Sequence, residues 1–188
     1  MSLSNEMPSI ATLFPLLLLL LGPALAQEQS VRPGINAPYQ TPNFSEWVER
    51  FEKEGREVYD KRREIIAATG VAPGMTVADV GAGTGLFTRL FAAETGPRGR
   101  VLAVDISSVF VENIQRIAKE QGLGNVKAIL GTPTDTRLPA GSVDLVFTSD
   151  AYHHFEVPTA MLRSIRESLR PGGTLVVMDF QRVPGVSS

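Results

Sequence analysis

With 188 residues and a net charge of −2, the chain has room for one domain and lacks the overall positive charge typical of proteins that bind nucleic acids. The absence of cysteine excludes disulfide bonds, thiolate catalysis and cysteine-based metal sites. The two histidines are adjacent and the acidic residues are scattered, so no ligand spacing indicates a structural metal.

The N-terminus has the pattern of a secretory signal peptide over residues 1–26. Leu13–Leu21 is nearly all leucine, and the small-x-small pattern at Ala24–Ala26 predicts cleavage after Ala26. The apolar run is too short to span a bilayer comfortably, so we expect no stable transmembrane span. Residues 1–10 contain neither Lys nor Arg, which departs from the pattern. We expect a periplasmic or secreted protein; an uncleaved membrane-proximal segment, or a misread start and a cytoplasmic protein, are the alternatives.

Residues 27–44 are rich in Pro, Gly, Asn and Gln and indicate a linker with little regular structure. From Ser45 onward the apolar spacing is helical, and the Glu, Arg and Lys residues in between are typical of a solvated helix face with i,i+4 ion pairs. The apolar positions are Trp47, Val48, Phe51, Val58, Tyr59, Ile65 and Ile66. The main domain is therefore expected over residues 45–188.

Residues 77–85 read V-A-D-V-G-A-G-T-G and predict a buried strand that runs into a glycine turn. The glycines permit positive φ and leave no Cβ between the backbone and a ligand. Leu86–Ala93 has helical apolar spacing, so the first N–H groups of a helix would face the turn. The segment predicts a site for a nucleotide-like cofactor; a glycine-rich turn without a ligand is the alternative.

The glycine spacing separates two cofactor classes. A dinucleotide site uses G-x-G-x-x-G under a pyrophosphate, whereas this turn is one residue tighter and follows a carboxylate, which suits an ammonium group better than a phosphate. Here the chain resembles the class I S-adenosylmethionine (SAM)-dependent methyltransferases. Their first motif, [D/E]-x-G-x-G-x-G, is matched at Asp79, Gly81, Gly83 and Gly85.

A second apolar strand, Arg100–Asp105, also ends in a carboxylate. An acid at the tip of this strand can accept hydrogen bonds from both hydroxyls of a ribose. Asp105 could instead be only the neighbour of the next helix, beside the capping residues Ser107 and Ser108. The resemblance implies that Asp105 binds the ribose of SAM and that Ile106 packs on the adenine.

Residues 131–139, G-T-P-T-D-T-R-L-P, resemble the loop after the third strand of the same family. The acid of that loop hydrogen-bonds the adenine amino group in the family. Here the acid is Asp135, which is shifted toward Leu138, and a threonine holds the usual acidic place. Both an adenine-binding Asp135 and a solvated loop aspartate stay open.

Both histidines, His153 and His154, follow the predicted fourth strand, Val143–Thr148, at the sheet edge where open α/β sheets bind ligands. Methyl transfer from a sulfonium is an in-line displacement that needs a base only when the acceptor starts protonated. We expect His153 or His154 to be that base, with Asp150 or Tyr152 nearby. A histidine packed at the strand end is the alternative.

The order of strands and helices over residues 76–180 predicts an α/β fold: a Rossmann-like, open, mostly parallel sheet with helices on both faces. The turn L-R-P-G-G-T at 169–174, before the apolar strand 175–180, is a frequent late motif of the same family, and the resemblance covers about residues 71–180. The family's sheet normally has seven strands. No residues remain here for the sixth and seventh, so we expect a C-terminally incomplete domain, a fragment or a chain whose sheet edge is covered by a partner.

The sequence therefore predicts SAM-dependent methyl transfer to an unidentified small-molecule acceptor. Within the family, the His-His-Phe segment at 153–155 and the Pro-Gly-Gly turn at 171–173 resemble the quinone-biosynthesis-like branch. A SAM-binding but inactive truncated protein is one alternative. An NAD(P)-dependent reductase is another, disfavoured by the glycine spacing, by Asp79 and by the absence of a Tyr-x-x-x-Lys pair. The resemblance also implies that the N-terminal helices cover the cofactor, which makes Tyr59, Arg62 and Arg63 candidates for binding the SAM carboxylate or an acidic substrate.

Overall fold

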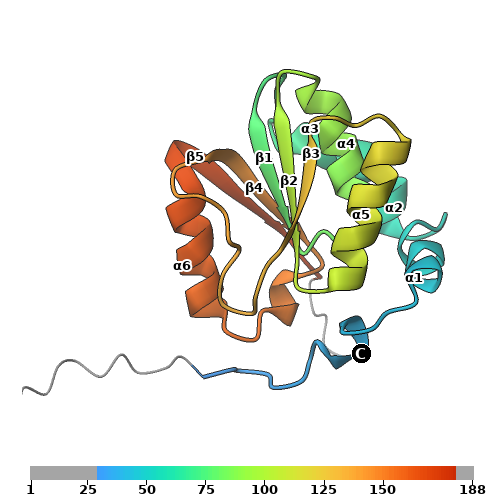
Figure 1. The fold of residues 1–188 in the computed structure, drawn as a ribbon, viewed down its shortest axis with the longest axis vertical. Coiled ribbons are helices and arrows are strands. Elements are labelled where there is room, and N and C mark those ends of the chain that lie inside the picture. Colours follow the sequence, from blue (N-terminus) through green and yellow to red (C-terminus); the bar gives the residue numbers. More distant parts are fainter. Residues whose placement is uncertain (1–28, 181–188) are drawn as a thin grey trace, which may run out of the picture.

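The computed structural model describes residues 29–180, whose five strands form one parallel sheet with helices on both faces (Figure 1). The strands lie in the order β3-β2-β1-β4-β5, and every neighbouring pair is parallel. They are β1 (Thr76–Val80), β2 (Arg100–Asp105), β3 (Val126–Leu130), β4 (Val143–Ser149) and β5 (Leu169–Met178). The predicted Rossmann-like fold is confirmed. The predicted signal peptide, residues 1–26, lies outside the described residues.

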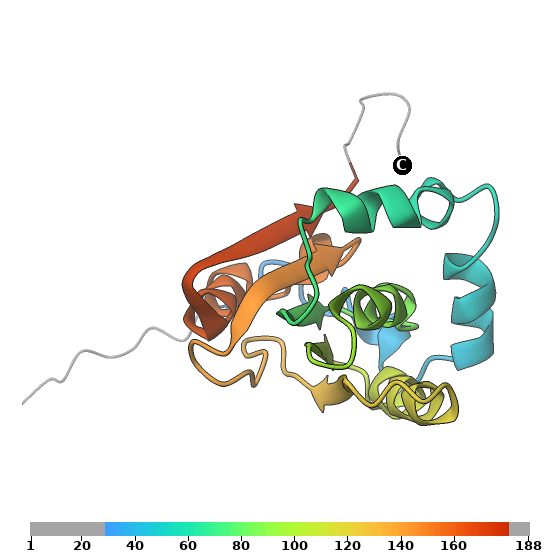
Figure 2. The same cartoon turned by 90° about the horizontal axis from the view of Figure 1, so that it is seen from above.

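Helices pack on both faces of the sheet. Helices α4 (Leu86–Thr95) and α5 (Ser108–Glu120) cover one face, and α6 (Pro158–Ser168) lies on the other (Figures 1 and 2). The chain passes from β3 to β4 through the loop of residues 131–142 without a helix. From β1, successive strands are added on one side of the sheet as far as β3, and β4 and β5 are then added on the other side of β1. The strand order therefore reverses between β1 and β4. Open α/β sheets bind ligands at the carboxyl ends of strands beside such a reversal.

Aromatic and β-branched side chains fill the core on both sides of the sheet. On the α4 side, the ring centroid of Phe147 lies 4.8 Å from that of Phe87 and 5.2 Å from that of Phe91. Burial of each such ring stabilises the fold by about 2 to 3 kcal/mol. On the α6 side, Val146 and Ile165 are fully buried in a second cluster. The core therefore holds the ends of β1 and β4 in fixed positions.

The helical pattern expected from Ser45 onward is divided among three short helices, α1 (Phe44–Phe51), α2 (Glu57–Asp60) and α3 (Arg62–Ala68). The division has a local cause. Gly55 has φ of +86°, which a helix does not allow, and its N–H donates to the Asp60 carboxylate at 3.1 Å. The chain therefore turns between α1 and α2 and brings residues near the break over the end of the sheet.

The predicted linker, residues 27–44, holds one short 3₁₀ helix, η1 (Ala37–Tyr39), in its described part. It is nonetheless attached to the domain. The N–H of Val31 donates to the carbonyl of Glu156 at 2.7 Å, and Asn36 is 7% exposed. The segment runs past the carboxyl ends of the strands, at the bottom of Figure 1.

The predicted turn at residues 169–174 is part of β5. Val143 pairs with Leu169 and Leu145 with Thr174, so five residue steps on β5 match two on β4 and the Pro-Gly-Gly segment bulges out of the pairing. In the described part of the chain β5 is an edge strand. Val177 on this strand is 45% exposed, which leaves apolar surface at the edge.

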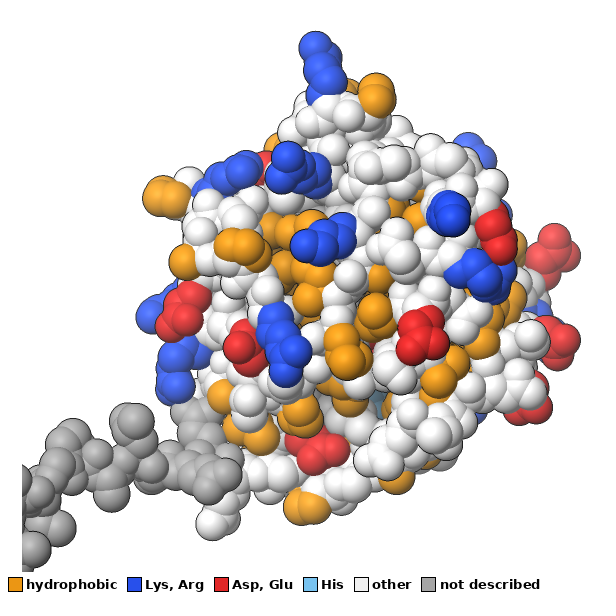
Figure 3. Space-filling view, viewed as in Figure 1, with side chains coloured by type: hydrophobic (Ala, Val, Ile, Leu, Met, Phe, Trp, Pro, Cys, Tyr) orange, Lys and Arg blue, Asp and Glu red, His pale blue; other side chains and the backbone are white. Residues whose placement is uncertain are grey.

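The α6 face of the sheet is less completely covered near β2 and β3. Figure 3 shows apolar side chains exposed in the middle of this view, with Lys and Arg side chains around them. A hollow in this region is lined by Leu102 and Ile129 together with Arg100, Lys127 and Arg137. Among the described helices, none has the length and apolar character needed to cross a bilayer.

Candidate functional site

A cavity of about 1050 Å³, part of it open to solvent, lies at the carboxyl ends of the strands. It is bounded by the loops after β1, β2, β3 and β4 and by the N-terminal segment, and it is large enough for a drug-sized ligand. The structure brings six of the predicted site residues to its wall. They are Asp79, Gly81, Gly83, Asp105, Ile106 and His154. Gly85, Asp135 and His153 are not part of the lining.

The glycine turn after β1 uses its N–H groups within the protein. The N–H groups of Gly81 and Ala82 donate to the carbonyl of Val104 at 2.8 and 3.1 Å, and that of Gly83 donates to the Asp105 carboxylate at 2.9 Å. The N–H of Gly85 donates to the carbonyl of Ala82 at 2.8 Å. A phosphate-binding loop instead directs such groups at the ligand. The turn is therefore shaped for a cofactor without a pyrophosphate.

Gly81 marks a close approach between the turns after β1 and β4. Its φ is +78°, and a Cβ at this position would lie 2.4 Å from the Cβ of Ala151. Gly85 is the N-cap residue of α4 with φ of +77°. Glycine at both positions follows from the backbone conformation. At Gly81 it also lets the two turns approach each other beside the cavity.

Gly81→Ala is expected to lower the free energy of unfolding by about 2 kcal/mol, because the added methyl group meets Ala151 in addition to the strain of positive φ. Gly122→Ala is a matched control, since Gly122 has φ of +68° but no heavy atom within 4 Å of the added Cβ. The control should lose about 1 kcal/mol. Urea unfolding measures both; equal losses would show that the close approach is unimportant.

Asp79 lies beneath the glycine turn and is 2% exposed. Its carboxylate accepts a hydrogen bond from the Thr88 hydroxyl at 2.6 Å, and a second one from the Thr88 backbone N–H. Burial raises the pKa of Asp79 to about 6, although the Thr88 hydroxyl opposes the shift. Arg89 also lowers the pKa, but the net shift is upward, so an ionised Asp79 has no cation that fully compensates its charge. A ligand with an ammonium group in this cavity would supply one.

Asp105 is held in place by two backbone groups. One carboxylate oxygen accepts from Gly83 N–H and the other from Ser107 N–H, both at 2.9 Å. Burial raises the pKa of Asp105, whereas these hydrogen bonds lower it. Each oxygen retains a lone pair for a further donor. The neighbouring Ile106 is 37% exposed and lines the cavity, so its side chain offers an apolar surface to a flat ring.

Asp135 is placed away from the cavity, on the side of α6. Its carboxylate accepts from Arg137 N–H at 2.7 Å and from the Ser164 hydroxyl at 3.0 Å. The cavity wall in this region is formed by other residues of the loop, namely Gly131, Thr132 and Pro133. The geometry therefore favours a loop-stabilising role for Asp135 over contact with an adenine ring.

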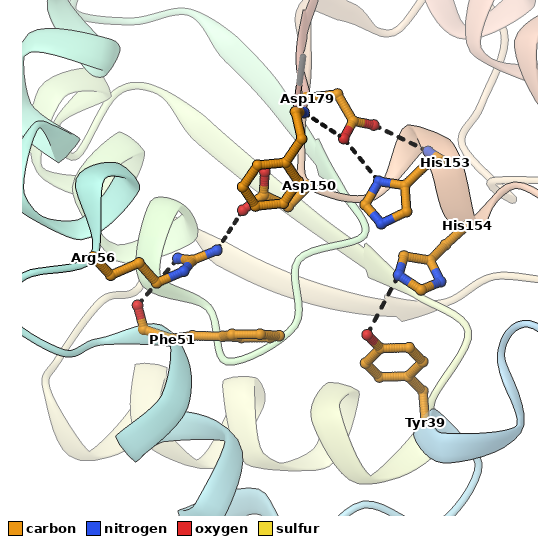
Figure 4. A network of polar contacts seen from close by, with 8 residues as sticks. Tyr39, Phe51, Arg56, Asp150, His153, His154 and Asp179 are labelled. Atoms are coloured by element: carbon orange, nitrogen blue, oxygen red, sulfur yellow. Dashed lines mark hydrogen bonds and ion pairs between the residues drawn. The ribbon is translucent and has the colours of Figure 1, made fainter. Parts of the chain in front are cut away.

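An arginine that the sequence patterns do not single out lies at the cavity wall. Arg56, at the break before α2, forms an ion pair with Asp150 at the end of β4, and it donates to the carbonyl of Phe51 at 3.2 Å (Figure 4). Asp150 has φ of +51°, and burial raises its pKa whereas Arg56 lowers it. Both side chains line the cavity.

The three residues proposed for the SAM carboxylate lie elsewhere. Tyr59 packs against the α4 side of the core, and the Arg62 guanidinium stacks 4.1 Å from the centroid of its ring. Arg63 is exposed. None of the three lines the cavity. The helical pattern placed Arg62 and Arg63 correctly on a helix but carried no information on which cation reaches the ligand side.

The two histidines occupy different environments in the short helix η2 (Tyr152–His154) (Figure 4). The Nε2 atom of His154 lies 3.4 Å from the Tyr39 hydroxyl, and its Nδ1 atom is buried and has no hydrogen-bond partner within residues 29–180. Burial, followed by the neighbouring His153, lowers the pKa of His154, so this ring is neutral near pH 7. His153 instead contacts Asp179, a residue that the sequence patterns did not indicate, with 2.7 Å between Nδ1 and Oδ1.

Aromatic side chains of the N-terminal segment close one side of the cavity. The ring centroid of Trp47 lies 4.8 Å from that of Tyr39 and 5.0 Å from that of Phe51. Glu52 fastens this segment to the glycine turn, because its carboxylate accepts from the Thr84 hydroxyl at 2.8 Å and pairs with an arginine of α4. The segment excludes water from one side of the site.

The family model for the methyltransferase domain matches residues 77–173, just over half of the chain. This chain belongs to the class I SAM-dependent methyltransferases. The matched region begins at β1 and ends in β5, so it contains the glycine turn, Asp105 and both histidines. The cofactor of the family is SAM, and the arrangement of Asp79, Asp105 and the hydrogen-bonded glycine turn fits it.

Curated relatives include methyltransferases of two kinds. The ubiquinone/menaquinone biosynthesis C-methyltransferase UbiE of Hydrogenovibrio crunogenus is 32% identical over 123 residues, which cover 65% of this chain and 48% of that protein. The nocamycin O-methyltransferase of Saccharothrix syringae is 33% identical over 134 residues, 63% of this chain and 48% of that protein. The chain thus spans about half the length of these relatives.

Solved structures share the fold. A SAM-dependent methyltransferase from Aquifex aeolicus superposes with a TM-score of 0.69 at 23% identity, over 79% of this chain and 78% of that one. At this identity the similarity shows a common fold and leaves the acceptor open.

Proposed function

We propose that this chain binds SAM at the carboxyl ends of β1 and β2 and transfers its methyl group to a small-molecule acceptor. The observation that carries the proposal is the pair of buried carboxylates, Asp79 and Asp105, on either side of a glycine turn whose N–H groups are already hydrogen-bonded. This arrangement suits an adenosine with a cationic side chain and disfavours a pyrophosphate.

The cavity offers a matching group for each end of the cofactor. At the tip of β2, Asp105 would accept both ribose hydroxyls, and Ile106 would pack on the adenine. At the end of β4, Arg56 would bind the carboxylate of the amino-acid moiety, while Asp150 and Asp79 would face its ammonium group. The Arg56–Asp150 pair thus presents one charge of each sign to a zwitterion.

The protein's part in the reaction is mainly alignment and exclusion of water. When bound, SAM supplies an activated methyl group. The core fixes the ends of β1 and β4, so Gly81 and Asp150 hold one end of the cofactor relative to the acceptor. Tyr39 and Phe51 line the same cavity and shield it from solvent. Such positioning accounts for a large part of the rate in a displacement that needs no acid.

We propose a flat, mostly apolar acceptor that carries a ring hydroxyl, such as a hydroquinone. Support comes from the cavity wall, where aromatic and thioether side chains, including Tyr39, Phe155 and Met161, provide apolar surface. The relatives also support it, since one is a ubiquinone/menaquinone biosynthesis C-methyltransferase and another an O-methyltransferase.

Calorimetry with SAM and with NADH tests the cofactor. We expect SAM to bind and NADH to give no heat of binding; the reverse result would overturn the proposal in favour of a reductase. Release of S-adenosylhomocysteine in the presence of 1,4-naphthohydroquinone then tests the transfer. Binding of SAM without such release, for this and other ring-hydroxyl acceptors, would favour the inactive SAM-binding alternative.

Arg56→Gln is expected to raise the Kd for SAM about tenfold, because the carboxylate of the ligand loses a charge-assisted hydrogen bond. The matched control is Arg62→Gln, which removes the same charge from a side chain stacked on Tyr59 outside the cavity. Isothermal calorimetry should find its Kd within about twofold of wild type. An equal effect of both substitutions would mean that net charge, and not Arg56 itself, matters.

A further inference from the structure

His153 is held by Asp179 through two contacts. The Asp179 Oδ1 atom lies 2.7 Å from His153 Nδ1, and Oδ2 accepts from the backbone N–H of His153 at 3.0 Å (Figure 4). Asp179 directly follows β5, and η2 follows β4, so two neighbouring strands fix the geometry. A carboxylate at Nδ1 favours the tautomer with its proton on Nδ1 and leaves Nε2 with a free lone pair.

The free edge of the His153 ring is exposed next to the cavity, although His153 is not one of the residues that line it. The side chain is 37% exposed, and Nε2 has no hydrogen-bond partner among the described residues. The His153 ring lies 4.3 Å from the ring of His154, which lines the cavity. Figure 4 shows the edge opposite Asp179 turned toward the side of the network where His154 and Tyr39 lie.

We propose that His153 is the general base that removes the proton from a neutral hydroxyl of the acceptor, and that Asp179 is its positioning residue. The proposal rests on the methyltransferase function proposed above and narrows the acceptor to one with an ionisable hydroxyl. It also separates the two histidines. His154 contacts the Tyr39 hydroxyl through Nε2, and its Nδ1 atom is buried. It therefore shapes the cavity wall and does not accept the proton of the acceptor.

The chemistry balances without a further reactant. The O–H bond of the acceptor breaks, its proton moves to Nε2, and its electron pair stays on the acceptor. The Asp179 carboxylate stabilises the resulting imidazolium. The bond from sulfur to methyl breaks with its electron pair left on sulfur as the new bond to the acceptor forms. If the oxygen is methylated, the imidazolium then releases its proton to water. If a ring carbon is methylated, the proton on that carbon leaves to water and the imidazolium returns its proton to the acceptor oxygen, which restores the aromatic ring and its hydroxyl.

Several titratable or charged groups face His153 from the surrounding elements. They are Asp179 after β5, His154 in η2 and Asp150 after β4, whose charge is partly compensated by Arg56 of the N-terminal segment. Replacing any one of these groups changes the electrostatic field at the His153 ring as well as its contacts. A pH profile of the variants therefore has to be compared with that of His154→Gln.

A first test measures the tautomer of the His153 ring by ¹⁵N NMR of the full chain, which requires no acceptor. We expect Nδ1 protonated and Nε2 unprotonated in the neutral ring, and loss of this preference in Asp179→Asn. A proton on Nε2 in the wild type, or an unchanged tautomer in the variant, would overturn the proposal. Calorimetry with SAM on the same samples should give Kd values within about twofold of each other; absence of SAM binding in the wild type would instead refute the proposed function.

A second test compares two probe acceptors. For 1,4-naphthohydroquinone, a neutral hydroxyl compound, His153→Gln and Asp179→Asn should lower kcat about 100-fold or more. Both variants should also lose the limb of the pH profile that reports the base, which is the fall of activity at low pH. For 4-nitrophenol, which is ionised at pH 8, the same variants should lose less than about threefold, because no proton has to be removed. Equal losses with both probes would assign His153 and Asp179 a structural role only. His154→Gln should retain, with 1,4-naphthohydroquinone, the limb of the pH profile that reports the base.

Discussion

Replacing Asp105 by alanine is expected to raise the Kd for SAM at least about 100-fold. Two hydrogen bonds from the ribose hydroxyls to an ionised carboxylate are lost, and each is worth about 1.5 to 3 kcal/mol. The substitution also frees the N–H of Gly83, which the carboxylate holds at 2.9 Å, so the glycine turn loses its anchor to the tip of β2. Isothermal calorimetry with SAM and S-adenosylhomocysteine measures the loss.

The matched control for this prediction is Asp135→Ala. Asp135 is the other acid that the sequence offered to the nucleoside, but its carboxylate contacts Arg137 N–H and the Ser164 hydroxyl outside the cavity. We expect its Kd for SAM to stay within about threefold of wild type, with a small loss of stability from the two hydrogen bonds. A large loss of affinity in Asp135→Ala would place this loop on the adenine after all.

The parts of the site that could be predicted from sequence are those with a local signal. A buried strand, a glycine turn and a helix are adjacent in the chain, so the pattern around Asp79 specifies the β1 turn directly. The same holds for Asp105, which ends an apolar strand. Because parallel strands end at one edge of the sheet, these two carboxylates had to meet there, and the structure places both at one cavity.

The residues that were missed depend on tertiary contacts. Arg56 meets Asp150 across 94 positions of sequence, and His153 meets Asp179 across 26. No periodicity relates such pairs. Arg56 stands beside Gly55, whose positive φ breaks the helical pattern, and that break is the one local sign that the chain turns toward the sheet there. Asp179 follows an apolar strand as Asp105 does, so the rule that located Asp105 could have located it as well.

Asp79→Asn is expected to stabilise the protein without ligand at pH 8 and to abolish most SAM binding. The folded-state pKa of about 6 lies above the ordinary value of 3.8, so the fold disfavours the ionised form. The contribution of protonated Asp79 to the free energy of unfolding is fully present below the pKa of the unfolded state. It is lost as the pH rises through about 6. At about 1.4 kcal/mol per pKa unit, the ionised carboxylate costs about 2 to 3 kcal/mol at pH 8. The neutral amide avoids this cost and can still accept from Thr88.

Urea unfolding of wild type and variant at pH 5 and pH 8 measures the effect, because the difference between the two proteins isolates Asp79 from the other carboxylates. Asp144→Asn is a control of opposite sign. Burial raises the pKa of Asp144, but hydrogen bonds from Thr76 N–H and from Arg170 outweigh it and leave the pKa below the ordinary value. The Asp144 contribution is therefore present above the unfolded pKa and lost as the pH falls, so Asp144→Asn should destabilise the protein at pH 8.

The ionisation of Asp79 should also control the affinity for SAM. An ammonium group near Asp79 compensates the buried charge, so the cofactor lowers the pKa of Asp79 and releases a proton when it binds below about pH 6. The Kd for SAM should therefore rise up to about tenfold per unit as the pH falls below 6. In Asp79→Asn the Kd should be higher throughout and this dependence should vanish. If the variant instead binds SAM as wild type does and is less stable at pH 8, Asp79 serves to cap α4 through Thr88 and has no part in recognising the cofactor.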